Sequence, residues 1–190
     1  MKRKTAKEIL ADSFRELTGQ KPADRITVRD ITANCGYSTA TFYRHFKNKY
    51  GLIAWDYARR YREMMSRSGE PGCSLFDCFL EGAAYFNAQK AYLANLIRHT
   101  AGFDSFAENM KAIHYEFLRN YFLALAGNSG LTARADMYIR FYSYGATDVT
   151  CDWLMGKIEA CPKDLAEIYE NALPQPLREL INSKNDTIQP

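Results

Sequence analysis

The sequence has no apolar run that approaches the roughly 18 residues needed for a membrane-spanning helix. Its basic start, residues 1–7, is not followed by the apolar segment of a secretory signal, so we expect a cytoplasmic protein with no membrane partner. Alternating β-branched runs bounded by hairpin turns are nearly absent, which argues against a sheet. We find no internal repeat and no low-complexity tract.

Patterns typical of enzymes and metal sites are also missing. The five cysteines are widely spaced, at Cys35, Cys73, Cys78, Cys151 and Cys161. None forms a C-x-x-C pair and no histidine lies at zinc-ligand spacing, so we expect free buried thiols and no metal or cofactor. No nucleophile–base pair, phosphate loop or paired carboxylates stand out; Asp148 and Asp152 lie four apart but fit a solvated helix face. We expect no catalytic residues, and a helical enzyme is the alternative of a different class.

The chain is rich in apolar residues, and its charged residues are unevenly distributed along the sequence. Its 190 residues are 47% hydrophobic, enough for a core in one large domain or two smaller ones. The net charge of +3 divides unevenly: residues 1–66 hold 14 Lys and Arg against 7 Asp and Glu, and residues 67–190 hold 11 against 15. A basic front before an acidic remainder suggests that the front binds a polyanion, although chance also produces such swings.

Helical periodicity dominates and predicts an all-α fold of about nine helices. Glycine, proline and serine in residues 66–72 mark a domain boundary, which gives an N-terminal three-helix domain with a linking helix at 1–66 and a helical bundle at 67–190. The N-terminal helices are predicted at about 4–18, 28–35, 39–46 and 49–65. The C-terminal helices are predicted at about 74–87, 89–99, 104–126, 132–157 and 162–173, followed by a frayed tail from residue 182.

Residues 27–46 have the order of a helix-turn-helix, in which the second helix enters the major groove of DNA. Thr27 and Ser38 are predicted caps, and Gly36 allows the turn between the helices. Phe42 and Phe46 form the inward face of the second helix, which leaves Tyr43 outward. We interpret His45 as a packed or capping histidine rather than a base reader.

The stretch from Ile26 to Leu52, ITVRDITANCGYSTATFYRHFKNKYGL, resembles the DNA-binding domain of TetR-family transcriptional regulators. The family pattern is a threonine-capped helix, a small-Gly-apolar-Ser turn, T-[LF]-Y-x-[HY]-F, a polar turn with lysine, and a leucine. Each piece is present in order, and the match covers about residues 5–55. Thr39 stands where many members have Lys or Arg, which leaves the operator sequence open. The TFYRHF string is also similar to the dihydroxyacetone-kinase regulator branch of the family.

The resemblance implies a homodimer that binds a palindromic DNA operator and a C-terminal domain that usually binds a small-molecule effector. Phosphate contacts carry over to Thr27, Tyr43 and Lys49. Base-edge contacts carry over to Ser38, Thr39, Ala40 and Arg44. We expect a repressor that the effector releases, and an activator working through a partner protein is the alternative.

The C-terminal part is dense in aromatic residues, which serve either a plain core or a ligand pocket. For an effector pocket, mostly on the strength of the resemblance, we expect Phe79, Phe86, His114, Phe117, Tyr121, Tyr138 and Tyr142. The helix at 132–157, together with the helix after Pro162, is the candidate dimer interface, a four-helix bundle across a two-fold axis. Its expected contacts are Phe141, Gly145, Val149 and Trp153; alternatively, this stripe faces only its own core.

Overall fold

Helices form all of the regular structure in residues 4–66, 73–102 and 105–186, the part of the chain that the computed structural model describes. This confirms the all-α prediction. The N-terminal helices are α1 (Ala6–Thr18), η1 (Ala23–Arg25), α2 (Val28–Cys35), α3 (Thr39–Tyr43) and α4 (Lys49–Met64). The C-terminal helices are α5 (Leu75–Ala88), α6 (Lys90–Arg98), α7 (Phe106–Ala126), η3 (Gly127–Ser129), α8 (Ala133–Leu154), α9 (Pro162–Asn171) and α10 (Gln175–Asp186). Within these residues no helix is long and apolar enough to cross a membrane.

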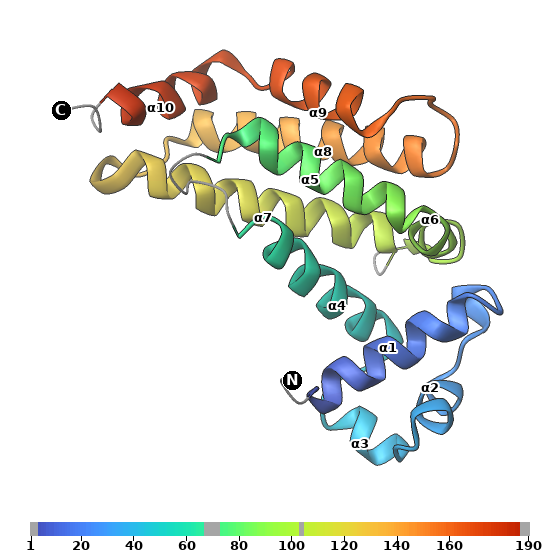
Figure 1. Ribbon diagram of the computed structural model, residues 1–190. Helices are drawn as coiled ribbons and strands as arrows, with labels where there is room; N and C mark the ends of the chain where they lie inside the picture. The colour runs from blue at the N-terminus through green and yellow to red at the C-terminus, as the bar shows by residue number, and fades with distance from the viewer. Residues whose placement is uncertain (1–3, 67–72, 103–104, 187–190) are drawn as a thin grey trace.

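Side-chain caps fix where the N-terminal helices begin. Thr27 and Asp30 form a reciprocal capping box at the start of α2, and the Ser38 hydroxyl accepts the Thr41 N–H at the start of α3. Both predicted caps are therefore confirmed. The helix after Ser38 ends at Tyr43 rather than Phe46. Figure 1 shows α1, α2 and α3 together at one end of the molecule.

The long helix α4 joins this end to the remaining helices (Figure 1). Its first half buries Leu52 and Ile53 among the N-terminal helices, and its second half buries Tyr57 and Tyr61 against α7. One continuous apolar core consequently runs from α1 to α9. The boundary predicted at residues 66–72 falls almost entirely on 67–72, outside the described residues.

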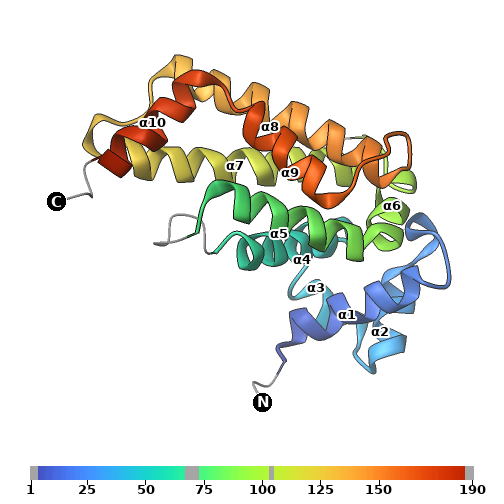
Figure 2. The same cartoon turned by 45° about the horizontal axis from the view of Figure 1, so that its top comes forward.

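The C-terminal helices pack as layers, with α7 against α8 and α5 against α9 (Figure 2). The sequence prediction ends its last helix near residue 173 and expects a frayed tail from residue 182, whereas α10 continues to Asp186. Pro176 lies in the first turn of α10, where its missing N–H has no partner to lose. Leu177 is fully buried and packs with Leu118 and Phe122, which anchors α10 on α7 and α8.

All five cysteines are free, as expected. Cys78 and Cys151 are buried, whereas Cys35 and Cys73 are half-buried. Cys161 is exposed, contrary to the expectation of buried thiols, because it stands at the N-cap of α9 on the protein surface.

Candidate functional site

The turn between α2 and α3 rests on Gly36, which has a left-handed backbone with φ 74°. A side chain at this angle is strained even where space is free, so glycine suits the position. On either side of the turn, Ile31 and Phe42 are fully buried in the common core. The helix-turn-helix predicted for residues 27–46 is thus formed.

The outer face of α3 carries the residues expected to read base edges. Ser38, Thr39, Ala40 and Arg44 are all exposed, and the Arg44 guanidinium donates to the Thr41 hydroxyl at 3.0 Å. Tyr43 is 59% exposed, which confirms that it points outward. These side chains form one polar surface that a DNA groove can approach.

His45 differs from the interpretation given above, because its side chain is exposed rather than packed. Its only aromatic neighbour among the described residues is Phe46, with ring centroids 6.4 Å apart. Phe46 itself turns inward and is buried beside Phe42, as expected. His45 therefore adds an exposed imidazole ring to the end of the helix-turn-helix.

Thr27 is exposed at the start of α2 and is held by its capping partner. The Asp30 carboxylate accepts the Thr27 N–H at 2.8 Å and an ammonium hydrogen of Lys21 at 2.9 Å. These bonds favour the charged carboxylate and lower the pKa of Asp30 to about 2. Asp30 therefore stays ionised at neutral pH and keeps the Thr27 backbone in place.

Lys49 is turned toward the protein itself. Its Nζ donates to the backbone carbonyls of Ala23, Asp24 and Ile26 at 2.9, 2.6 and 2.9 Å. An ammonium group has three donors, so these bonds occupy all of them. Partial burial also lowers the pKa of Lys49 below its usual value. In this structure the contacts of Lys49 therefore fasten α4 to the η1 turn.

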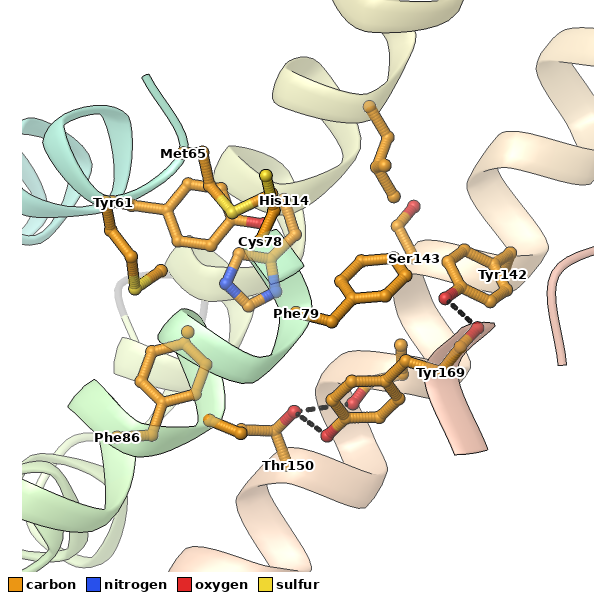
Figure 3. A pocket seen from close by; sticks show the side chains of 15 residues that line it. Tyr61, Met65, Cys78, Phe79, Phe86, His114, Tyr142, Ser143, Thr150 and Tyr169 are labelled. Carbon is orange, nitrogen blue, oxygen red and sulfur yellow. Dashed lines mark hydrogen bonds between the residues drawn. The ribbon is translucent and has the colours of Figure 1, made fainter. Parts of the chain in front are cut away.

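A small cavity of about 50 Å³ lies among the C-terminal helices and the end of α4 (Figure 3). Of the residues expected in an effector pocket, Phe79, Phe86, His114 and Tyr142 line it. Sequence reasoning missed other lining residues, namely Tyr61, Met64, Met65, Cys78, Gly82, Ala83, Leu118, Ser143, Ala146, Thr150 and Tyr169. The spacing of Cys78, Gly82 and Phe86 at every fourth position is a signal that could have identified the α5 wall.

His114 is buried in the wall of this cavity and bonded on both ring nitrogens. Its Nε2 lies 2.6 Å from the Tyr57 hydroxyl and its Nδ1 lies 2.8 Å from the Thr147 hydroxyl. Thr147 donates its only hydroxyl hydrogen to the Ser143 carbonyl at 2.7 Å, so its oxygen accepts the hydrogen bond from His114. The ring is therefore neutral with its proton on Nδ1. Burial lowers the pKa of His114 to about 3.

Three hydroxyls of the cavity walls also have partners inside the protein. The Tyr142 hydroxyl donates to the Tyr169 carbonyl at 2.6 Å, and the Tyr169 hydroxyl lies 2.7 Å from the Thr150 hydroxyl (Figure 3). Burial raises the pKa of Tyr169 to about 12, so it stays protonated. The described ranges contain no cluster of three acidic, histidine or cysteine side chains that could hold a metal ion.

The remaining predicted pocket residues lie elsewhere. Phe117 and Tyr121 line a separate, larger groove of about 450 Å³ between α4 and α7, which also includes Arg62 and Glu116. Tyr61 belongs to the walls of both hollows. Tyr138 lines neither of these two, and its hydroxyl lies 3.4 Å from the Arg134 guanidinium. The predicted pocket is thus divided, because α7 turns its residues toward two sides.

Comparison with known families agrees with this arrangement. The profile described as "Bacterial regulatory proteins, tetR family" matches residues 10–54, and the profile "Transcriptional regulator C-terminal region" matches residues 74–175, more than half of the chain. The chain belongs to the TetR family. It is a DNA-binding transcription regulator with a helix-turn-helix.

Two solved structures share the fold of this regulator at low sequence identity. "Dihydroxyacetone kinase operon activator DhaS" is 14% identical, with a TM-score of 0.58, and the match covers 91% of this chain and 96% of that one. A TetR transcriptional regulator from Rhodococcus sp. RHA1 is 16% identical, with a TM-score of 0.65, over 88% of this chain and 95% of that one. A search of curated proteins gave no match.

The residues expected at a dimer interface of the regulator divide between surface and core. Phe141 is 83% exposed and Gly145 is also exposed, whereas Val149 is half-buried. Trp153 is 2% exposed, and its indole N–H donates to the Ala160 carbonyl at 2.9 Å, so its side chain packs inside the protomer. Sequence reasoning missed two exposed apolar residues, Met137 on α8 and Ile168 on α9, at 71% and 52% exposure.

Proposed function

We propose that this regulator binds a palindromic operator as a homodimer and represses transcription until a small molecule enters the C-terminal cavity. The observation that carries the proposal is the shared helix α4, which begins beside the helix-turn-helix and ends as a wall of the cavity. The exposed polar face of α3 supports DNA contact through Ser38, Thr39, Ala40, Tyr43 and Arg44.

Dimerisation is supported by the exposed apolar residues of α8 and α9. Met137, Phe141 and Gly145 follow one another at intervals of four, so they lie on one face of α8. Ile168 supplies a comparable apolar residue on α9. Burial of such apolar surface by a second copy of the chain would stabilise a dimer. To fill successive major grooves, the two recognition helices of that dimer must lie about 34–36 Å apart, or a multiple of this distance.

The size of the cavity supports a mechanism for release. A volume of about 50 Å³ has room for water but not for a ligand site of the usual several hundred Å³, so a ligand must displace wall residues. Tyr61, Met64 and Met65 of α4 are part of that wall. A ligand that pushes them aside would favour another position of α4 and therefore another separation of the recognition helices.

The cavity walls also indicate the chemistry of the effector. Phe79, Ala83 and Phe86 offer apolar contacts, whereas the hydroxyls of Tyr142 and Thr150 already bond within the protein. A small, mainly apolar molecule with few polar groups fits these walls best. A strongly charged effector would lose hydration without gaining a partner of opposite charge.

Electrophoretic mobility with DNA from upstream of the regulator's own gene tests the function. We expect a retarded band at low salt that weakens as salt rises, because phosphate contacts release counterions. Arg44→Ala should weaken the band, while the matched substitution Arg98→Ala, of an exposed arginine at the end of α6, should not. No retardation at micromolar protein and low salt would contradict the proposal.

A second candidate is an activator that works with a partner protein and needs no small ligand. The small volume of the cavity favours it, and one structural relative carries the word "activator" in its name. In vitro transcription with purified RNA polymerase separates the two candidates. A fall in transcript on adding the regulator supports repression, whereas a rise that requires a second protein supports activation.

A further inference from the structure

Cys73 and Cys78 place their sulfur atoms 3.5 Å apart at the start of α5. The helix cap between them explains this closeness. Ser74 is the N-cap and forms a capping box with Asp77, so Cys73 precedes the cap and Cys78 follows it by four residues. Residues at these two positions commonly pack on each other as a hydrophobic staple. In this protein both staple residues are thiols.

The two thiols differ in exposure. Cys78 is fully buried and lines the cavity, and its burial raises the pKa of the thiol to about 12. Cys73 is half-buried, so it is closer to the solvent than Cys78. Among the described residues no other two thiols are in contact: Cys35, for example, bonds to the Ile31 carbonyl of its own helix.

We propose that Cys73 and Cys78 are a modification site for hydroperoxides, at which a reversible disulfide forms. The Cys73 thiol releases its proton, and the thiolate attacks one peroxide oxygen. The O–O bond breaks, and the departing oxygen takes up that proton and leaves as water or an alcohol. The Cys78 sulfur then gives up its proton and attacks the sulfenic sulfur of Cys73. The S–O bond breaks and a molecule of water leaves. The two thiols lose two electrons in total and the peroxide gains them.

The required movement is small and bears on the cavity. The sulfur atoms have to close from 3.5 Å to a bond of about 2.05 Å, which side-chain rotation at a helix end can supply. Cys78 would then turn toward Cys73. Figure 3 shows Cys78 near Met65 and Tyr61, two residues of α4 that line the same cavity. Oxidation therefore changes a wall that α4 and α5 share.

Peptide mass after peroxide treatment tests the disulfide directly. Trypsin releases residues 68–90 as one peptide with both thiols and no internal lysine or arginine. After treatment with hydrogen peroxide and alkylation, we expect this peptide to have lost two hydrogens and to carry no alkyl group. Dithiothreitol should restore two alkylation sites. Two alkylated thiols in this peptide, under conditions that oxidise the exposed Cys161, would overturn the proposal.

Variants separate the pair from general thiol oxidation. Cys161→Ser should behave like the wild type, because Cys161 lies outside the pair. Cys78→Ser should let Cys73 proceed to sulfinic acid, since no resolving thiol remains. If wild type and Cys78→Ser gave the same sulfinic product, Cys78 would not be the partner.

Thermal unfolding gives a second readout that needs neither DNA nor effector. Oxidised and reduced wild type should differ in midpoint by a few degrees, because the bond restrains the first turn of α5. Cys73→Ser keeps the buried Cys78 in the core and should show no shift between the two treatments. Equal midpoints for oxidised and reduced wild type would contradict an effect of the disulfide on the fold.

Discussion

The Tyr57 hydroxyl of α4 and the His114 Nε2 of α7 lie 2.6 Å apart in the protein interior. His114 donates its Nδ1–H to the Thr147 hydroxyl of α8, so one chain of hydrogen bonds crosses three helices. The imidazole has no room for a second proton, because both nitrogens are already engaged and the site is buried. The packing of α4 against the C-terminal helices therefore requires the neutral form of His114.

Acid should weaken this packing. The pKa of His114 falls from 6.5 to about 3 in the folded protein, so the unfolded chain binds the proton more tightly. The stability that the neutral ring contributes is complete above pH 6.5 and declines toward pH 3, by about 1.4 kcal/mol per pH unit. Denaturant unfolding at pH 7 and pH 4.5 measures the loss, which we expect to be roughly 2–3 kcal/mol for this residue.

His114→Gln is the control for that titration. Glutamine keeps a hydrogen-bond donor and an acceptor but does not titrate. Its own contribution to the free energy of unfolding should therefore not change with pH. Wild type should therefore lose more stability than the variant between pH 7 and pH 4.5. Asp30 titrates near pH 2 and lies below this range. Parallel curves for the two proteins would contradict the buried neutral histidine.

Lys49→Ala should act on stability rather than on the salt dependence of DNA binding. The substitution leaves the carbonyls of Ala23, Asp24 and Ile26 without their shared donor, at a cost of about 1–3 kcal/mol. Denaturant unfolding measures this loss. Lys47→Ala removes a nearby exposed charge and should change stability by less than about 0.5 kcal/mol.

The same variant distinguishes the two roles considered for Lys49. If Lys49 contacts a phosphate, the slope of log affinity against log salt should fall by about one. We expect that slope to stay as in the wild type once the fraction of folded protein is taken into account. An unchanged stability with a reduced slope would show that the internal bonds of Lys49 give way to a phosphate.

Tyr43→Phe should weaken DNA binding without affecting the fold. Tyr43 is 59% exposed, and its hydroxyl has no hydrogen-bond partner among the described residues. The loss of this hydroxyl should therefore remove a contact to DNA but no contact inside the protein. We expect affinity to fall by up to about tenfold, equally for different DNA sequences. Titrations with an operator and an unrelated duplex measure this. A change in sequence preference alone would instead make Tyr43 a base reader.

Phe141→Asp should separate the dimer. Phe141 is 83% exposed in the protomer, and a carboxylate buried in an apolar interface lacks a partner. We expect analytical ultracentrifugation to give a dimer for the wild type and a monomer for the variant. Tyr43→Asp changes another exposed aromatic residue, in α3, and should leave the dimer intact. A dimer that survives Phe141→Asp would place the interface elsewhere.

The DNA-binding helices could be predicted because their signals are local. The bond between Ser38 and Thr41 and the turn at Gly36 join residues that are close in sequence. Phe42 and Phe46 needed only helical periodicity to be placed inward. The cavity could be predicted only in part, since residue type and spacing do not reveal which neighbours face each side of α7. Phe117 consequently lies on a different side from His114.

The sequence by itself determined an all-helical chain with a helix-turn-helix in its basic N-terminal third, because caps, turns and helical periodicity depend on residues close together in the sequence. Only the tertiary structure decided what depends on distant partners. It turned Lys49 toward carbonyls about twenty-five positions earlier, and it enclosed His114 between Tyr57 and Thr147. Burial removed water from His114, so its ring had to take its hydrogen bonds from the groups that the fold brought near. The half-buried Lys49 gave all three of its donors to carbonyls that the fold placed beside it.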